Sequence, residues 1–416
     1  MDDGGRDHGP APRAPADRGR AVPPRVDPHH AWHGPAPQLA RSREGARPHA
    51  EGRSPRGSGP VSAQAASFPH VFEQIARDER ALPRALVRRS FDAILAGAWT
   101  PVQVAGFVVA LRLRGEDAST IAAAAEAMRA VMVRVDHGLT AVLDTCGTGG
   151  DGLGTLNVST AAALVCAAAG APVAKHGNRS VSSRSGSADV LEALGVPIDV
   201  PPERQAEVLR EARLAFLFAP AHHPAMRHGA PVRRELAIRT IFNALGPLSN
   251  PASATHQLLG TYDHALRPVF AATLCELGLR RAWVVRGEDG LDEVSPFGPT
   301  RVTELARGSL REIVVRPESF GLPVSPPGAI QGGSAAENAE VILSVLRGEP
   351  HPARCAIVLN AAAALAVFRE LDDPREWPDL AAEAAGALDS GAAIERLEAL
   401  REAASRAREE GEGGAP

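Results

Sequence analysis

Between Phe68 and about Arg134, apolar residues recur at three- and four-residue spacing, which is the periodicity of amphipathic helices. In one such segment they are Leu86, Val87, Phe91, Ile94 and Leu95. Thr100 is the expected N-cap of a further helix that has Pro101 at its first position, and Asp117 lies where another begins. Because no strand pattern occurs here, we predict a small all-helical domain over residues 68–138.

After Ala141, short apolar runs rich in β-branched residues alternate with amphipathic segments. The predicted strands are 141–143, 172–174, 215–218, 282–286 and 312–315, and long helices are predicted at 335–346 and 353–369. Strands separated by helices indicate an α/β domain with a mostly parallel central sheet covered by helices. We place this domain at residues 139–400 and expect residues 401–416 to form a charged, frayed tail.

Residues 1–67 contain much Pro, Gly, Arg and His without periodicity, so we predict a disordered extension or a wrongly assigned start. They lack the apolar segment of a secretory signal, and their Asp residues argue against a transit peptide. His29, His30 and His33 are expected to be solvated rather than metal-bound.

Composition narrows the function classes. A chain of 416 residues is long enough for two or three domains. Its formal net charge of −4 provides no general basic surface for nucleic acid, and no apolar run reaches the roughly 18 residues of a membrane span. Four widely spaced cysteines, Cys146, Cys166, Cys275 and Cys355, fit small buried side chains in a reducing cytoplasm.

A glycine-rich loop is the first sign of chemistry. Five glycines lie between Asp144 and Thr155, directly after a predicted strand. Glycines let successive backbone N–H groups surround an anion. Ser159 is the expected N-cap of the following helix, whose N-terminus would face the same anion. Lys175, the only lysine among 45 basic residues, follows the next predicted strand, and a polar loop at 180–187 precedes another helix. Together these segments predict a phosphate site.

These segments resemble the phosphoribosyl-diphosphate site of the anthranilate phosphoribosyltransferases, enzymes of tryptophan biosynthesis. The resemblance extends from about Leu82 to about Leu400. The matching motifs stand at 147–151, 157–160, 175–183, 186–189, 231–234, 239–251 and 290–294.

The resemblance implies transfer of a phosphoribosyl group to the amine of anthranilate, with diphosphate leaving through an oxocarbenium-like transition state. Such a reaction depends on positioning and charge stabilisation, here implied for Lys175 and Arg179, and no catalytic base is evident. The implied contacts to 5-phosphoribosyl 1-diphosphate are Gly147, Gly150, Asp151, Thr155, Asn157, Val158, Ser159, Thr160, Lys175, His176, Gly177, Asn178, Arg179, Ser180, Val181, Ser182, Ser183 and Ser187.

The resemblance also implies a magnesium site and an acceptor site. Ser159, Asp292 and Glu293 would hold Mg²⁺, expected as two ions, because Mg²⁺ prefers a few carboxylates together with substrate phosphates. The preceding residues 287–289 are Gly-Glu-Asp where a histidine-glycine turn is expected, which leaves their effect on metal affinity open. Gly147, Asn178 and Arg233 would bind anthranilate, with Arg233 on its carboxylate. For His176 and His223, packing and substrate contact remain equal alternatives.

Segments near 230–252 are implied to pack onto the helical domain, which would place the active site in a hinge cleft. A cytoplasmic homodimer joined through the helical domain is a further implication. Two alternatives are a pyrimidine nucleoside phosphorylase, which shares the fold, and a non-catalytic nucleic-acid-binding relative. The motif at 157–160, the acidic pair at 292–293 and the negative charge disfavour both.

Overall fold

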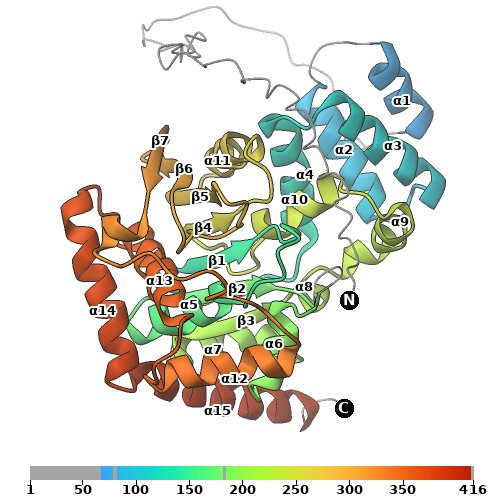
Figure 1. Ribbon diagram of the computed structural model, residues 1–416. Coiled ribbons are helices and arrows are strands. Elements are labelled where there is room, and N and C mark those ends of the chain that lie inside the picture. Colours follow the sequence, from blue (N-terminus) through green and yellow to red (C-terminus); the bar gives the residue numbers. More distant parts are fainter. Residues whose placement is uncertain (1–66, 78–81, 181–183, 414–416) are drawn as a thin grey trace, which may run out of the picture. The chain divides into compact units, whose positions relative to one another are not determined.

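The computed structural model describes residues 67–77, 82–180 and 184–413 (Figure 1). Of the predicted extension at residues 1–67, residues 1–66, with the histidine cluster, lie outside the described residues. Val181, Ser182 and Ser183 lie outside them as well.

Four helices form the first part of the described chain, as the apolar periodicity predicts. They are α1 (Phe68–Arg77), α2 (Arg84–Leu95), α3 (Pro101–Arg114) and α4 (Ala118–Val131). The predicted start of α3 is confirmed, because the Thr100 hydroxyl accepts from the Gln103 N–H and the Gln103 side chain accepts from the Thr100 N–H. Asp117 caps α4 by accepting from the Thr120 N–H at 2.7 Å.

A seven-stranded sheet forms the centre of the α/β part, in the order β3-β2-β1-β4-β5-β6-β7. Strands β1 to β5 are mutually parallel, and β6 runs antiparallel to both of its neighbours, β5 and β7, so the predicted mostly parallel sheet is confirmed. The strands are β1 (Leu143–Gly147), β2 (Val173–Gly177), β3 (Leu214–Phe218), β4 (His256–Gly260), β5 (Arg281–Gly287), β6 (Thr300–Ala306) and β7 (Ser309–Val315).

Two strands, β4 and β6, were not predicted, and two others, β1 and β2, extend further than predicted. β4 contains no β-branched residue, and four of the seven residues of β6 (Thr-Arg-Val-Thr-Glu-Leu-Ala) are polar, so neither shows a continuous run of apolar β-branched residues. β1 and β2 continue to Gly147 and Gly177. Lys175 therefore lies inside β2 rather than at its end.

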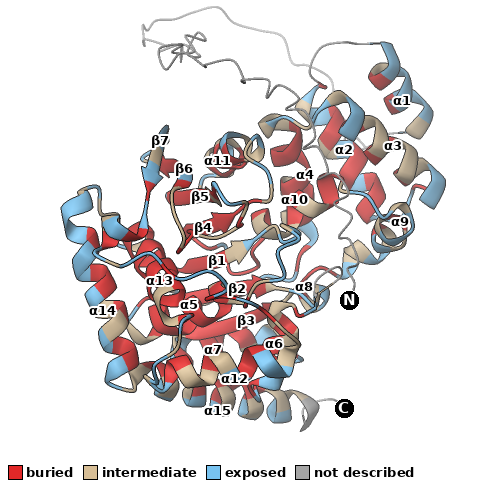
Figure 2. Cartoon of the chain, viewed as in Figure 1, coloured by how far each residue is buried: buried red, intermediate tan, exposed pale blue. Residues whose placement is uncertain are grey.

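Hydrophobic residues form two large clusters on opposite faces of the sheet (Figure 2). Alternate residues of β5 belong to different clusters, because successive side chains of a strand point to opposite faces of the sheet. Trp283 and Val285 belong to one, whereas Ala282 and Val284 belong to the other. The first cluster includes residues of α5, α7 and α12–α15, and the second joins α11 to α2–α4.

The remaining helices surround these elements. They are α5 (Val158–Ala168), α6 (Ser187–Ala193), η1 (Pro202–Arg204), α7 (Gln205–Ala212), α8 (Ala219–His222), η2 (Pro224–His228), α9 (Ala230–Leu236), α10 (Ile241–Leu248), α11 (Leu266–Glu276), η3 (Pro317–Phe320), α12 (Ala335–Leu346), α13 (Arg354–Phe368), η4 (Pro374–Glu376), α14 (Trp377–Asp389) and α15 (Ala392–Gly413). Val232 of α9 and Phe242 of α10 share the hydrophobic cluster of α2–α4. Figure 1 shows both helices on that side of the sheet.

The expected frayed tail after Arg401 is wrong, because α15 continues as a helix to Gly413. Ala403, Ala404 and Ala407 are buried in the first hydrophobic cluster. The Arg401 guanidinium donates to the Leu194 carbonyl at 2.5 Å. Charged residues occupy the outer face of this helix, and its small apolar residues face the protein.

Among the described residues, no helix combines the length and apolarity needed to cross a membrane.

Candidate active site

The glycine-rich loop leaves the carboxyl end of β1 and is held by β4 and by the segment after β5. The Thr148 N–H donates to the Gly260 carbonyl at 2.9 Å, and the Gly149 N–H donates to Asp292 Oδ2 at 3.0 Å. Gly147 and Gly260 permit this approach, since a Cβ atom would lie 2.8 Å from Asp292 Oδ2 at Gly147 and 1.6 Å from the Asp292 carbonyl oxygen at Gly260. A side chain at either glycine would therefore displace Asp292 from the loop.

The N-terminus of α5 binds a carboxylate of the protein itself. Its N-cap is Asn157, not Ser159 as expected, and the Asn157 side chain makes no capping bond. It contacts Ser185 and Asn338 instead. The Ser159 N–H donates to Glu293 Oε1 at 3.2 Å. Glu293 thus lies at the positive end of the helix, where a carboxylate is favoured.

Lys175 connects the sheet to this helix start. Its ammonium is buried and donates to the Thr145 carbonyl at 2.5 Å and to Ser159 Oγ at 3.2 Å. Burial lowers the pKa of Lys175, while the nearby Asp144 and Glu293 carboxylates oppose that shift. A fixed ammonium therefore supports Ser159 and the end of β1 from within the sheet.

Asp292 and Glu293 are adjacent carboxylates that resist ionisation. Burial, followed by repulsion from Asp151, raises the pKa of Asp292 to about 7. Burial, followed by repulsion from Asp292, raises the pKa of Glu293 to about 8, and Lys175 opposes that shift. Asp151 Oδ2 is also buried and has no hydrogen-bond partner in the described chain. A cation placed among these oxygens would favour their charged forms.

These oxygen donors fit Mg²⁺, which binds through one or two carboxylates and completes its shell with phosphates and water. No group of three or more His, Cys, Asp or Glu side chains suited to holding a metal occurs in the described parts of the chain. Asp292 and Glu293 therefore offer part of a coordination shell, as expected for a metal that arrives with a phosphorylated substrate.

The unexpected acids at residues 288 and 289 point to other partners. Glu288 forms an ion pair with Arg301 at 2.5 Å. Asp289 accepts from the Leu291 N–H at 3.2 Å and from the Ser295 hydroxyl. Neither carboxylate has a contact with Asp292 or Glu293 among the described hydrogen bonds and ion pairs, so their charge is already compensated locally.

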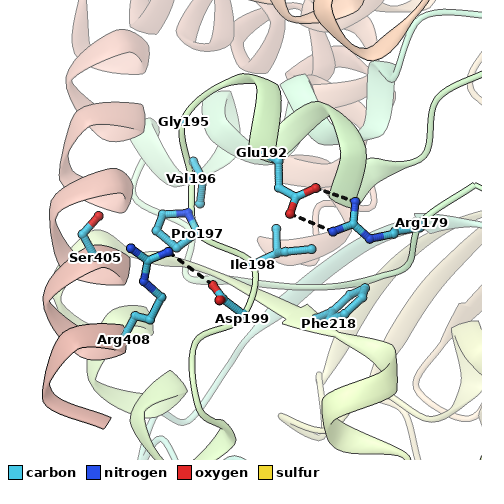
Figure 3. A pocket seen from close by; sticks show the side chains of 10 residues that line it. All are labelled: Arg179, Glu192, Gly195, Val196, Pro197, Ile198, Asp199, Phe218, Ser405 and Arg408. Atoms are coloured by element: carbon cyan, nitrogen blue, oxygen red, sulfur yellow. Dashed lines mark hydrogen bonds and ion pairs between the residues drawn. The ribbon is translucent and has the colours of Figure 1, made fainter. Parts of the chain in front are cut away.

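Arg179 also has partners away from the glycine-rich loop. Its guanidinium pairs with Glu192 at 2.5 and 2.7 Å and with Asp189 at 3.1 Å, and these acids raise the pKa of Arg179. Figure 3 shows this pair on the wall of a pocket of about 500 Å³, beside Phe218 and opposite Arg408 of α15. Lys175, Ser159, Asp292 and Glu293 are not among its lining residues. Contact between Arg179 and a phosphate would require these ion pairs to rearrange.

Arg233, the predicted carboxylate ligand, lies on α9 and is half-buried. Burial lowers its pKa. Within the described residues its guanidinium has no ion-pair or hydrogen-bond partner, in contrast to Arg179. A partly desolvated cation without a partner is suited to bind a carboxylate through two parallel hydrogen bonds.

The other predicted contact residues lie on the same few elements. Gly150, Asp151 and Thr155 are in the glycine-rich loop, and Val158 and Thr160 are in the first turn of α5. His176 and Gly177 end β2, Asn178 and Ser180 follow it, and Ser187 is the first residue of α6. The Asn178 carbonyl accepts from the Ser187 hydroxyl at 3.3 Å, and its side-chain oxygen accepts from the Arg179 N–H at 2.7 Å.

The imidazole rings of His176, at the end of β2, and His223 contact each other. His176 Nδ1 contacts the Gly246 carbonyl at 2.9 Å, and because a carbonyl only accepts, that nitrogen carries the proton. His176 Nε2 is then the acceptor for His223 Nε2, 3.2 Å away. Burial lowers the pKa of both rings, that of His223 to about 4.

The last three backbone carbonyls of α10 accept hydrogen bonds from side chains of the sheet and of the α1–α4 helices. The Gly246 carbonyl contacts His176 of β2, the Pro247 carbonyl accepts from Gln257 of β4 at 2.7 Å, and the Leu248 carbonyl accepts from Arg129 of α4 at 2.7 Å. A helix end leaves these groups without intrahelical partners. They therefore join the sheet and the α1–α4 helices at one point.

Arg239 and Tyr262, which were not among the predicted site residues, also contact the glycine-rich loop. The Arg239 guanidinium donates to the Gly150 carbonyl and lies over the ring of Tyr262. Arg239 stands within a motif that supported the resemblance, and Tyr262 is the only tyrosine of the chain. That uniqueness was the one available signal for Tyr262.

Comparison with known proteins agrees with this arrangement. Residues 139–394 match the family model described as glycosyl transferase family, a/b domain, and residues 71–132 match the helical bundle domain of the same family. The anthranilate phosphoribosyltransferase of Methylobacterium radiotolerans is 52% identical over 320 residues, which cover 77% of this chain and 92% of that protein.

Solved structures give the same result. The anthranilate phosphoribosyltransferase of Thermus thermophilus is 42% identical, with a TM-score of 0.75 and coverage of 80% of this chain and 99% of that one. The Saccharomyces cerevisiae enzyme in complex with PRPP and Mg is 28% identical, with a TM-score of 0.76 and coverage of 83% and 99%. The chain belongs to the anthranilate phosphoribosyltransferase family.

Proposed function

We propose that the chain transfers the 5-phosphoribosyl group of 5-phosphoribosyl 1-diphosphate to the amine of anthranilate. In this reaction the amine nitrogen forms a bond to C1 of the ribose, the bond between C1 and the diphosphate oxygen breaks, and the amine loses one proton to solvent. The products are N-(5-phosphoribosyl)anthranilate and diphosphate. The single observation that carries the proposal is that hydrogen bonds bring the glycine-rich loop, Ser159, Asp292 and Glu293 together. The Gly149 N–H donates to Asp292, the Ser159 N–H donates to Glu293, and the Lys175 ammonium donates to the Ser159 hydroxyl.

The donor is proposed to bind along the glycine-rich loop and the start of α5. In the described chain the N–H groups of Gly150, Asp151 and Gly152 donate to no protein acceptor, and backbone N–H groups in such a loop suit phosphate oxygens. Lys175 contributes a fixed positive charge behind Ser159. Its burial suits charge stabilisation that requires no reorganisation when the diphosphate departs.

Mg²⁺ is proposed to be held by Asp292, Glu293 and the Ser159 hydroxyl, as two ions. When bound, it neutralises negative charge on the departing diphosphate. Support comes from the raised pKa values of both carboxylates, which a cation would offset. The residues of the chain orient this site through the Gly149 and Ser159 N–H groups.

Anthranilate is proposed to place its carboxylate on Arg233, with Asn178 and the Gly147 backbone near its amine. The support is the half-buried Arg233 guanidinium, which has no described protein partner. A neutral aromatic amine is already a nucleophile, so positioning rather than a strong base is required.

We further propose a homodimer in the cytoplasm. The α3 residues Val102 and Leu113 are 82% and 83% exposed, which leaves apolar surface on the helical part for a second copy. Sedimentation of the wild type and of Leu113→Asp tests this: a dimer that becomes a monomer in the variant is expected, and a wild-type monomer contradicts it.

The catalytic proposal is tested by following anthranilate fluorescence after addition of 5-phosphoribosyl 1-diphosphate, with and without Mg²⁺. We expect magnesium-dependent loss of the signal together with equimolar release of diphosphate. Retained fluorescence, with donor binding still detected by calorimetry, would reject anthranilate as the acceptor and would withdraw Arg233 and Asn178 first.

A further inference from the structure

Arg239, in the segment between α9 and α10, contacts the glycine-rich loop. The guanidinium carbon of Arg239 lies 3.5 Å from the centre of the Tyr262 ring, and its Nη2 donates to the Gly150 carbonyl. At this distance the cation stacks directly on the aromatic face, which favours a guanidinium over an ammonium. One side chain thus joins three segments that are distant in the sequence.

Tyr262 is itself tied to the loop that Arg239 contacts. It follows β4, and its N–H donates to the Thr148 hydroxyl at 3.1 Å, while the Thr148 N–H donates to the Gly260 carbonyl at 2.9 Å. The Tyr262 ring is therefore fixed beside the first half of the loop, and Arg239 bridges from that ring to Gly150.

The backbone at Gly150 is shaped around this guanidinium. Gly150 has φ of 80°, and a Cβ atom there would lie 2.6 Å from Arg239 Nη2. The carbonyl of Gly150 therefore faces Arg239, and the next two N–H groups, of Asp151 and Gly152, donate to no described protein acceptor. Holding the carbonyl in place also fixes the direction of the peptide groups beside it.

Resting on the proposed function, we infer that Arg239 is a positioning residue for the donor: stacked on Tyr262, it fixes the glycine-rich loop in the conformation that receives the diphosphate of 5-phosphoribosyl 1-diphosphate. Arg239 acts through the loop backbone. Its loss should therefore weaken donor binding more than anthranilate binding, although α9, which carries Arg233, ends only three residues before it.

The experiment compares Arg239→Gln, Arg239→Lys, Tyr262→Leu and Tyr262→Phe with Arg234→Gln, an exposed arginine of α9, as the matched control. For each purified variant we would measure the KM for both substrates and kcat. Calorimetry would give the Kd of 5-phosphoribosyl 1-diphosphate with Mg²⁺ and without anthranilate, and a thermal melt would report folding.

We expect Arg239→Gln and Tyr262→Leu to raise the Kd and KM for the donor at least about tenfold, as loss of a charge-assisted hydrogen bond implies. The KM for anthranilate should stay within about twofold. Arg239→Lys should behave like Arg239→Gln, and Tyr262→Phe, which keeps the ring, should retain the wild-type donor Kd.

The inference is overturned if folded Arg239→Gln binds the donor as the wild type does, or if both KM values rise equally. It is also overturned if Tyr262→Phe is as damaging as Tyr262→Leu. Because the Kd is measured without turnover, the comparisons of donor Kd among these variants stand even if the wild type makes no phosphoribosylanthranilate, a result that would reject the proposed function alone.

Discussion

The ammonium nitrogen of Lys175 lies 3.2 Å from the hydroxyl oxygen of Ser159 and 2.5 Å from the Thr145 carbonyl oxygen. The chain's only lysine is therefore an internal support of the proposed phosphate and metal site. A compact ammonium can donate to several acceptors at the end of a buried stem, whereas a guanidinium needs a wider planar space.

Because Lys175 is the only lysine, its ammonium can be observed alone after labelling with lysine enriched in ¹⁵N at the side chain. We expect an NMR titration to give a pKa below the ordinary value for lysine, because burial disfavours the charged form. Glu293→Gln should lower that pKa further, since Glu293 stabilises the ammonium. An ordinary lysine pKa in the folded protein would contradict the buried position.

Lys175→Arg tests whether the ammonium is required. The longer, planar side chain must fit a buried strand position, so we expect kcat/KM to fall at least about 100-fold and the melting temperature to drop. Lys175→Met keeps the length but removes the charge, and should lose activity with a smaller change in melting temperature. Full activity of Lys175→Arg would reject the requirement for an ammonium.

Asp292 and Glu293 should make stability depend on pH and, if they hold the proposed metal, on Mg²⁺. Their folded pKa values of about 7 and 8 lie above the usual acid values, so between about pH 5 and 8 the folded state holds more protons than the unfolded state. The free energy of unfolding should therefore decrease as pH rises through that window, by up to about 1.4 kcal/mol per pH unit for each retained proton.

Melting curves from pH 5 to 9 check this dependence. Mg²⁺ should flatten it at the alkaline end, because it binds the ionised carboxylates, and Asp292→Asn should also reduce it. Glu288→Gln is the control, since Glu288 is exposed and pairs with Arg301. Stability that is independent of Mg²⁺ at every pH, with and without 5-phosphoribosyl 1-diphosphate, would contradict the metal site.

Arg233→Gln should raise the KM for anthranilate about 10- to 100-fold, because the proposed charge-assisted contact with the anthranilate carboxylate would be lost. The KM for the donor should change little, since Arg233 has no described contact with the glycine-rich loop. The neighbouring exposed Arg234 provides the control as Arg234→Gln. Equal effects from the two substitutions would show that only general charge matters.

The His176–His223 contact predicts acid sensitivity. Burial keeps the folded pKa of His223 at about 4, whereas an unfolded histidine titrates near pH 6.5, so the unfolded state binds more protons between those values. The contribution of His223 to stability should thus be complete above about pH 6.5 and decline as pH falls toward 4.

His223→Leu should reduce this decline and lower the free energy of unfolding at pH 8 by about 1–3 kcal/mol, because His176 Nε2 loses its donor. His223→Gln, which can place an N–H donor near the same position, should restore most of that stability. Chemical unfolding at several pH values measures both effects, and identical pH profiles for wild type and His223→Leu would refute the assignment.

The last helix should be essential for stability. Ala404 is 2% exposed, so Ala404→Asp places a carboxylate in the first hydrophobic cluster and should lower the free energy of unfolding by roughly 3 kcal/mol or more. Glu402→Asp, on the exposed face of the same helix, should change it by less than about 0.5 kcal/mol. Comparable denaturation midpoints for both variants would indicate a frayed helix.

Much of the site is predictable from the sequence because it depends on local properties. The glycines between residues 147 and 154, the lone lysine and the acidic pair at 292–293 are visible in the order of residues. The helix starts at Thr100 and Asp117 are equally local, since each cap involves a residue three positions ahead. The parallel sheet follows from strands that alternate with helices.

Tertiary contacts decided the rest. Glu293 occupies the N-terminus of α5 although 134 residues separate it from Ser159, and β4 forms part of the sheet without any β-branched residue. The burial of Ala404 required knowledge of the partners of α15. Residue order by itself determined which groups can donate, accept or carry charge. Only the fold determined which of these groups are buried against one another. Desolvation and hydrogen bonding depend on neighbours that the chain brings together from distant positions.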